Sequence, residues 1–182
     1  QASRSRARVG PSGEPILLLE QNRALWDRLL IRRGLAALER AEELSDAMGP
    51  YTLQAAIAAC HARAFTAEET DWARIADLYA QLAALSGSPV VELNRAVALG
   101  MAYGPEVGLE LADQLAGEPA LKGYHLLPGV RGDLLFKLGR REEARAEFER
   151  AAELTRNERE REVMRKRAAA CIADDDAAGG SP

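Results

Sequence analysis

Two histidines, His61 and His125, are the side chains of this sequence best suited to acid–base chemistry near neutral pH. A catalytic histidine works beside a nucleophile or a polarised substrate group, and neither residue lies in a motif that supplies a serine or cysteine nucleophile. Each histidine falls in a stretch compatible with a helix, where a hydrogen-bonded packing role is common. The sequence therefore predicts no catalytic residues and a protein that is not an enzyme.

The sequence lacks the ligand patterns that are usual for metal and cofactor sites. The sequence has no H-x3-H, C-x2-C or D-x-D-x-D-G arrangement, and the triplet Asp174 to Asp176 resembles a solvated tail. The glycine loops that hold nucleotide phosphates, G-x4-G-K-[ST] and G-x-G-x2-G, are also absent from the sequence. We expect no metal and no cofactor. Trp26, Trp72, Tyr79 and Phe148 could form a ligand cage, but their helical spacing favours core packing.

Length and composition favour a helical protein. The chain has 182 residues, of which 47% are apolar and only 5% aromatic. Alanine and leucine supply most of the apolar residues, and both prefer helices to sheets. The net charge of −4 gives no reason to expect that this chain binds DNA by itself. Because no apolar run is long enough to span a membrane and the two cysteines form no recognisable motif, we expect a cytoplasmic location with reduced thiols and no membrane partner.

The chain divides into three segments by composition. Residues 1–15 combine arginines with Pro, Ser and Gly and show no periodicity, so they are predicted as a flexible linker. Residues 16–172 show apolar residues every three to four positions and are predicted as a helical domain. Residues 173–182 are acidic with Gly and Ser, and we expect a disordered tail. The start without Met suggests a piece of a longer protein.

A repeat organises the helical segment. From Tyr124 to Asn157 the sequence predicts a helix, a tight turn at Leu138-Gly139 and a second helix whose Ala144-x3-Phe148 step is typical of tetratricopeptide repeats of 34 residues. Small residues recur at Ala37, Ala76, Gly108 and Ala144, the last three separated by 32 and 36 residues. We predict an all-α fold of tetratricopeptide-like antiparallel hairpins, stacked into a short right-handed superhelix of about 7–9 helices. An irregular all-α bundle is the alternative.

Tetratricopeptide stacks present the first helix of each hairpin along a concave groove that holds a peptide or another domain. The polar residues predicted on those helices are the candidates for protein contact: Gln54, His61, Asn94, Arg95, Tyr124, His125 and Arg131. We expect the strongest contributions from Asn94, Arg95 and Arg131. The alternative for Asn94 and Arg131 is a structural role, with hydrogen bonds between repeats.

Several ordered strings resemble one known family. They span Gly13 to Ile172 and include GEPILLLEQNR from Gly13, LWDR from Leu25, YTLQAAIAA from Tyr51, TDW from Thr70, SPVVELNRAVA from Ser88, YHLL from Tyr124 and RGDLL from Arg131. Together they resemble the C-terminal extension of a group of extracytoplasmic-function (ECF) RNA polymerase sigma factors. That family commonly has Ala where this chain has Gly132, a change that we expect to be harmless for packing.

The resemblance implies a tetratricopeptide-like domain that tunes a sigma factor in place of a separate anti-sigma protein. The intact protein would direct promoter-specific transcription initiation and would bind DNA only through N-terminal regions missing here. The implied partners are the sigma regions of the same polypeptide, the RNA polymerase core or a regulatory protein. Two alternatives stay open: a free-standing tetratricopeptide-like adaptor not involved in transcription, and a small-molecule sensor or enzyme with a closed apolar pocket.

Overall fold

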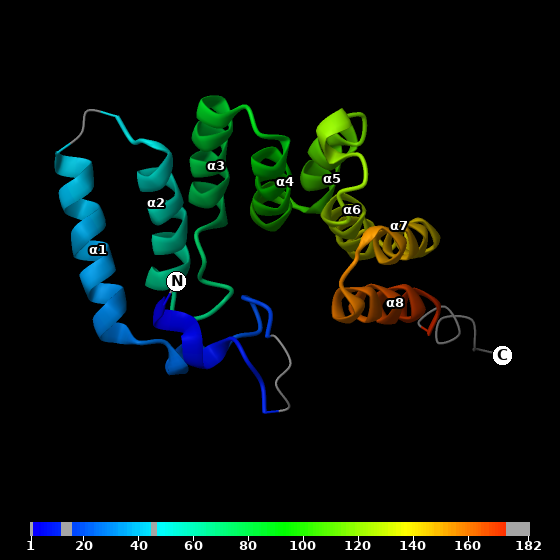
Figure 1. Cartoon of the computed structure of the whole chain (residues 1–182), viewed down its shortest axis with the longest axis horizontal. Helices are drawn as coiled ribbons and strands as arrows, with labels where there is room; N and C mark the ends of the chain where they lie inside the picture. The colour runs from blue at the N-terminus through cyan, green and yellow to red at the C-terminus, as the bar shows by residue number, and fades with distance from the viewer. Residues whose placement is uncertain (1, 12–15, 45–46, 174–182) are drawn as a thin grey trace. The chain divides into compact units, whose positions relative to one another are not determined.

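The computed structural model describes residues 2–11, 16–44 and 47–173, and these residues form helices and no β-strand (Figure 1). The predicted all-α helical-repeat class is confirmed. The predicted tail, apart from Ala173, lies outside the described residues. In chain order the helices are the 3-10 helices η1 (Ala2–Ala7) and η2 (Arg23–Leu25), α1 (Arg28–Glu43), α2 (Pro50–Arg63), α3 (Trp72–Ser86), α4 (Pro89–Tyr103), α5 (Pro105–Leu115), the 3-10 helix η3 (Pro119–Leu121), α6 (Leu126–Lys137), α7 (Arg141–Leu154) and α8 (Glu158–Ala173).

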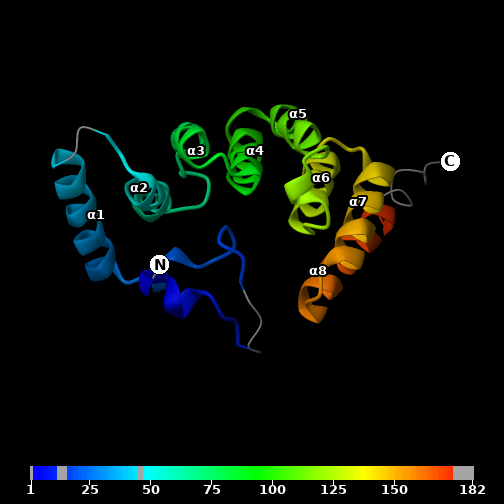
Figure 2. The same ribbon diagram turned by 45° about the horizontal axis from the view of Figure 1, so that its top comes forward.

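The helices belong to two compact units, unit 1 (Gln1–Ser86) and unit 2 (Gly87–Pro182), and each is described by itself. In unit 1, α2 packs against α3 and α1 packs against α2. In unit 2, α4 packs against α5, α6 against α7, and α8 against α7, and Figure 2 shows α7 and α8 side by side. Because the predicted superhelix would extend over both units, it stays a prediction.

The hairpin of α6 and α7 is built as the sequence predicts. Gly139 takes a φ of +74°, which glycine adopts without strain, and its amide donates to the carbonyl of Phe136 at 3.0 Å. This arrangement ends α6 and lets α7 fold back. Phe148 of α7 is 2% exposed in the core of unit 2. A Cβ atom at Gly132 would lie 2.8 Å from its ring, so glycine at this position leaves room for the Phe148 ring against α6.

Small residues mark the places where neighbouring helices approach closely. Ala76, Gly108 and Ala144 are all buried, as their predicted facing positions require. Ala37 is exposed on α1, so the predicted extension of the repeat to that position is wrong. The reason is that α1 turns Ile31 and Leu38 inward instead. The hairpins that the small residues mark are therefore α2 with α3, α4 with α5, and α6 with α7.

The N-terminal segment packs on unit 1 in the part that the structure describes. Ala7 of η1 is 1% exposed and clusters with Trp26 and Ile31. The amide of Asp27 donates to the carbonyl of Ser3 at 2.8 Å. These contacts differ from the flexible linker predicted for residues 1–15, because alanine and arginine stems in η1 find an apolar surface next to Trp26.

Apolar residues recur every three to four positions from Asn22 onward and predict one continuous helix, but the chain is interrupted before α1. The chain is extended at Trp26 and Asp27, between η2 and α1. The Asp27 carboxylate accepts hydrogen bonds from the amides of Leu29 and Leu30, both at 2.9 Å. This capping starts α1 one residue later. The break turns the Trp26 side chain into the interior of unit 1, where it is 3% exposed.

Candidate functional site

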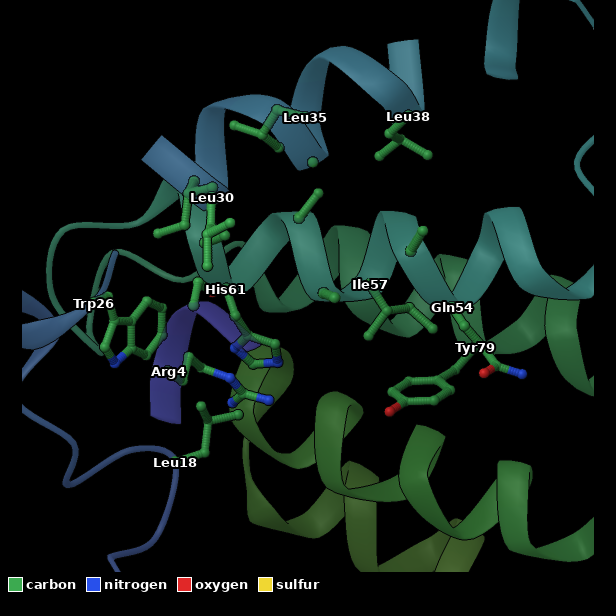
Figure 3. Close-up of a pocket in the computed structure, with 17 residues that line it drawn as sticks. Arg4, Leu18, Trp26, Leu30, Leu35, Leu38, Gln54, Ile57, His61 and Tyr79 are labelled. Carbon is green, nitrogen blue, oxygen red and sulfur yellow. The ribbon is translucent and has the colours of Figure 1, made fainter. Parts of the chain in front are cut away.

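A cavity of about 590 Å³ lies inside unit 1, among η1, α1, α2 and α3 (Figure 3). Its walls are mainly apolar and include Trp26, Leu30, Ile31, Leu35, Leu38 and Ile57. Its polar lining residues are Ser3, Arg4, Gln54, His61 and Tyr79. Among the described residues that line this cavity, none is acidic. We refer to it as the unit 1 cavity.

Helix periodicity explains which side chains face the unit 1 cavity. On α1, Ile31, Leu35 and Leu38 recur at intervals of three to four residues, which places them on one face. On α2, Gln54, Ile57 and His61 follow the same spacing. The α2 helix begins at Pro50, whose fixed φ suits the first turn. Thus Gln54 and His61, two of the predicted contact residues, share one cavity.

His61 is held neutral by its surroundings. Its ring lies edge-on to that of Trp72, with the ring centroids 5.2 Å apart, and its Nδ1 atom is buried without a hydrogen-bond partner among the described residues. Burial, and then the positive charges of Arg23 and Arg4, lower the pKa of His61 from 6.5 to about 4. At neutral pH its imidazole is therefore uncharged.

The lowered pKa of His61 predicts how stability depends on pH. Because the folded-state pKa lies below the unfolded value, the unfolded chain binds more protons between pH 4 and 6.5, and the free energy of unfolding falls as the pH drops through this window. Since the ring is partly exposed, we expect a loss on the order of 1 kcal/mol. Urea unfolding of the chain and of His61→Gln at pH 7.5 and 5 measures it. An equal pH dependence in both proteins would contradict the assignment.

Arg23 is a site residue that sequence reasoning did not single out. The side chain is 5% exposed, and its Nη1 atom donates to the carbonyls of His61 and Ala64, both at 2.9 Å. Its Nη2 atom donates to the Thr70 hydroxyl at 3.0 Å, and its guanidinium lies 5.0 Å from the ring centroid of Trp26. The two carbonyls belong to the C-terminal end of α2, where a helix leaves acceptors unpaired. Arg23 therefore fixes the end of α2 that carries His61.

Arg131, in unit 2, joins three helices. Its Nε atom on α6 lies 2.9 Å from an Asp113 carboxylate oxygen on α5, and its Nη1 atom pairs with Glu147 on α7. This is the arrangement that the structural alternative for Arg131 predicts. Asn94 and Arg95 lie on α4, where Asn94 is exposed and Arg95 pairs with Glu92 of the same helix at 2.8 Å.

Arg131 and Asn94, both in unit 2, have different expected roles in stability. We expect Arg131→Ala to lower the free energy of unfolding by about 1–2 kcal/mol, because Asp113 and Glu147 lose their shared cation. We expect Asn94→Ala to change it by less than about 0.5 kcal/mol, since the side chain is exposed. Chemical denaturation followed by circular dichroism compares the two variants. A loss for Asn94→Ala as large as that for Arg131→Ala would refute this distinction.

Tyr124 and His125 also make contacts within unit 2. Tyr124 is partly buried against the cluster of Leu93, Leu115, Leu121 and Leu127. The Nε2 atom of His125 lies 3.1 Å from a carboxylate oxygen of Glu160 on α8, and the same oxygen accepts from the Thr155 hydroxyl at 2.6 Å. Tyr124 thus contributes to the core of unit 2, and His125 helps to hold α8.

Asn157, followed three residues later by Glu160, has the spacing of a capping box at the start of α8, and the structure forms it only in part. The Asn157 side chain accepts from the Arg159 amide at 3.0 Å, as a cap should. The reciprocal bond from Glu160 is replaced, because the Asn157 amide donates to the Thr155 hydroxyl at 3.2 Å.

The described residues form neither a metal-binding cluster nor a membrane-spanning helix. Within residues 2–11, 16–44 and 47–173, no group of three or more His, Cys, Asp or Glu side chains is placed to hold a metal ion. In the same part of the chain, no helix has the length and apolar character needed to cross a membrane.

This chain is similar to a protein family of unknown function and to an uncharacterized bacterial protein. Residues 1–42 match a family of unknown function, DUF6596. Over 165 residues the chain is 47% identical to an uncharacterized protein of Rhizobium meliloti (strain 1021), a match that covers 91% of this chain and 38% of that protein. The chain thus spans well under half the length of this curated relative. No solved structure matches it.

The family match falls on the segment that shapes the unit 1 cavity. Residues 1–42 contain η1, η2 and nearly all of α1, and with them Arg4, Arg23 and Trp26. Arg4 and Trp26 line the cavity directly, and Arg23 holds the adjoining end of α2. The segment similar to DUF6596 therefore forms one wall of the unit 1 cavity. It also contains Arg23, whose hydrogen bonds fix the end of α2, the helix that forms another wall.

Proposed function

We propose that this chain is the C-terminal regulatory protein-interaction domain of a bacterial ECF RNA polymerase sigma factor. The observation that carries the proposal is the match of residues 1–42 to DUF6596, which describes the C-terminal region of sigma-70-like proteins. The sequence segments that resemble the ECF group, such as SPVVELNRAVA from Ser88, then favour an ECF sigma factor over other sigma-70-like proteins. On this proposal the protein is cytoplasmic, and the domain has no enzymatic activity of its own.

The architecture of each unit supports a role in protein interaction. Helical hairpins that pack on their neighbours leave the outward polar side chains of their first helices available to a partner. In unit 2, Asn94 on α4 is such a residue, and the partly exposed Arg95 next to it pairs with Glu92 of its own helix, whereas Arg131 and His125 pair with carboxylates of other helices. We therefore place the contact surface of unit 2 at Asn94 and Arg95.

The relative's length supports the same assignment. The matched part makes up 38% of the Rhizobium meliloti protein, which leaves room in that protein for regions that bind DNA and polymerase. In a sigma factor those regions would contact the promoter, and this domain would contact them, the polymerase core or a regulatory protein. DNA binding then belongs to the intact protein and not to this chain, whose net charge is −4.

A binding experiment tests the proposed interaction. The purified chain is titrated with RNA polymerase core and with the sigma regions encoded with it, and we expect the double variant Asn94→Ala/Arg95→Ala to bind about tenfold more weakly. Lys166→Ala is the control, because Lys166 is an exposed, ion-paired residue on α8. Binding to none of these partners, together with an encoding gene that lacks sigma regions, would overturn the proposal and favour a free-standing adaptor.

A further inference from the structure

We propose that the unit 1 cavity binds an uncharged, elongated molecule that has an apolar middle and a hydrogen-bonding group at each end. One end group would meet His61, and the other would meet Gln54 and Tyr79. This inference goes beyond the proposed function and does not depend on it. It rests on described residues of unit 1 alone.

The size and walls of the unit 1 cavity suit a small molecule. Its volume of about 590 Å³ falls in the range of about 300–1,000 Å³ that is typical of small-molecule sites. Leu35 and Leu38 of α1 and Ile57 of α2 form a largely aliphatic wall, and the Trp26 ring closes one end. An apolar segment packed against this wall would be removed from water, which is the main favourable term in such binding.

Helix geometry places polar groups at two separate ends of the cavity. Gln54 and His61 are seven residues apart on α2, so they share one face about 10 Å apart along the helix axis, with Ile57 between them. On α3, which packs antiparallel to α2, Trp72 meets the His61 ring and Tyr79 lies seven residues further along. Tyr79 is therefore level with Gln54, and Figure 3 shows both at the end of the cavity opposite His61.

The polar side chains at both ends have hydrogen-bonding capacity to spare. Within the described part of the chain, the Gln54 amide, the His61 imidazole and the Tyr79 hydroxyl make no hydrogen bond. Since the Nδ1 atom of His61 is buried, its Nε2 atom is the nitrogen left for a ligand. The imidazole is held in place before a ligand arrives, because Trp72 packs edge-on against it and Arg23 fixes this end of α2.

The lining disfavours charged ligands of either sign. No described lining residue is acidic, so a cation would meet no opposite charge. Arg4 is the one charged residue of the described lining, and it already interacts with other groups of the protein, so its charge is not available to an anion. Burial lowers the pKa of His61 and raises that of Tyr79, so both are neutral at pH 7. A charged ligand would lose hydration without compensation, whereas an uncharged one would not.

Calorimetric titration of the 182-residue chain with 1,8-octanediol at pH 7.5 tests the proposal. We expect saturable binding to one site with a dissociation constant below about 1 mM, at least about tenfold tighter than that of octanedioate or 1,8-diaminooctane, which have the same length but carry charges. Tyr79→Phe should weaken octanediol binding about threefold to tenfold, because it removes one hydroxyl and keeps the ring. Tyr51→Phe is the matched control, since Tyr51 is an exposed tyrosine of α2 that does not line the cavity.

A second variant separates loss of the site from loss of the fold. Ala58→Leu adds volume to the cavity lining and is expected to weaken octanediol binding while melting temperature and helicity stay close to those of the parent chain. The proposal is overturned if the parent chain shows no saturable binding, if octanedioate or the diamine binds as tightly as octanediol, or if Tyr79→Phe binds as tightly as Tyr51→Phe. Displacement of octanediol by a helix from the sigma regions would make the cavity a protein-docking groove and would also overturn it.

Discussion

Replacing Arg23 with alanine is expected to lower the free energy of unfolding of unit 1 by about 3 kcal/mol or more. The side chain is 5% exposed and donates to the carbonyls of His61 and Ala64 and to the Thr70 hydroxyl. Alanine would leave these acceptors buried without a donor and would remove the group that packs on Trp26. The loss should therefore exceed that of an ordinary surface arginine.

Tryptophan fluorescence during urea unfolding measures this loss directly, because both tryptophans, Trp26 and Trp72, belong to unit 1. Arg33→Ala on α1 is the matched control and should change the free energy by less than about 0.5 kcal/mol. Arg23→Lys should fall between the two, since an ammonium keeps the charge but not the planar fork. A loss below about 1 kcal/mol for Arg23→Ala would show that the buried hydrogen bonds do not hold α2 in place.

Gly108→Ala is expected to destabilise unit 2 by about 2 kcal/mol, even though alanine is the better helix former. A Cβ atom at Gly108 would lie 2.6 Å from the Ala96 carbonyl oxygen and 2.9 Å from the Gly100 Cα atom. Both are backbone atoms of α4, so the contact can be relieved only by moving α4 away from α5. That movement would disturb the core that includes Ala96, Leu109 and Phe148.

The opposite result is expected for Gly34→Ala. Gly34 lies within α1, and a Cβ atom there would have no neighbour within 4 Å. Alanine should therefore raise stability by about 0.5–1 kcal/mol through its helix propensity. Thermal unfolding followed at 222 nm compares both variants with the parent chain. If Gly108→Ala and Gly34→Ala change the melting temperature in the same direction, the close packing of α4 on α5 is not what fixes glycine at position 108.

The hairpins could be predicted because their signals are local. Gly139 ends α6 by its own backbone conformation, and the Ala144-x3-Phe148 step places both side chains on the buried face of α7. Proline that follows glycine or serine is a local signal of the same kind, and it stands at the starts of α2, α4 and α5. The same local logic failed at Ala37, because the inward face of α1 is chosen by contacts with α2 that are not encoded within α1 itself.

The site was harder to predict because its contacts join distant residues. Arg23 meets Thr70 across 47 positions of sequence, so no spacing rule near Arg23 reveals its burial. The signal that could have drawn attention to it is the polar string Gln21-Asn22-Arg23 between an apolar run and the start of α1. Arg131 shows the opposite case: its polar side chain on a first helix was predicted to contact a partner protein, and the structure pairs it with Asp113 and Glu147.

We proposed that this chain is part of a longer sigma factor and regulates it, and transcription in vitro tests this most directly. Run-off transcription with purified RNA polymerase core compares the longer polypeptide that carries the chain with the same polypeptide lacking residues 1–182. We predict that the longer polypeptide directs initiation at its own promoter and that deletion changes the transcript yield at least about tenfold, a coupling of about 1.4 kcal/mol. The Asn94→Ala/Arg95→Ala variant should shift the yield in the same direction. Equal yields with and without the chain, or no promoter-directed transcript from the longer polypeptide, would contradict the claim.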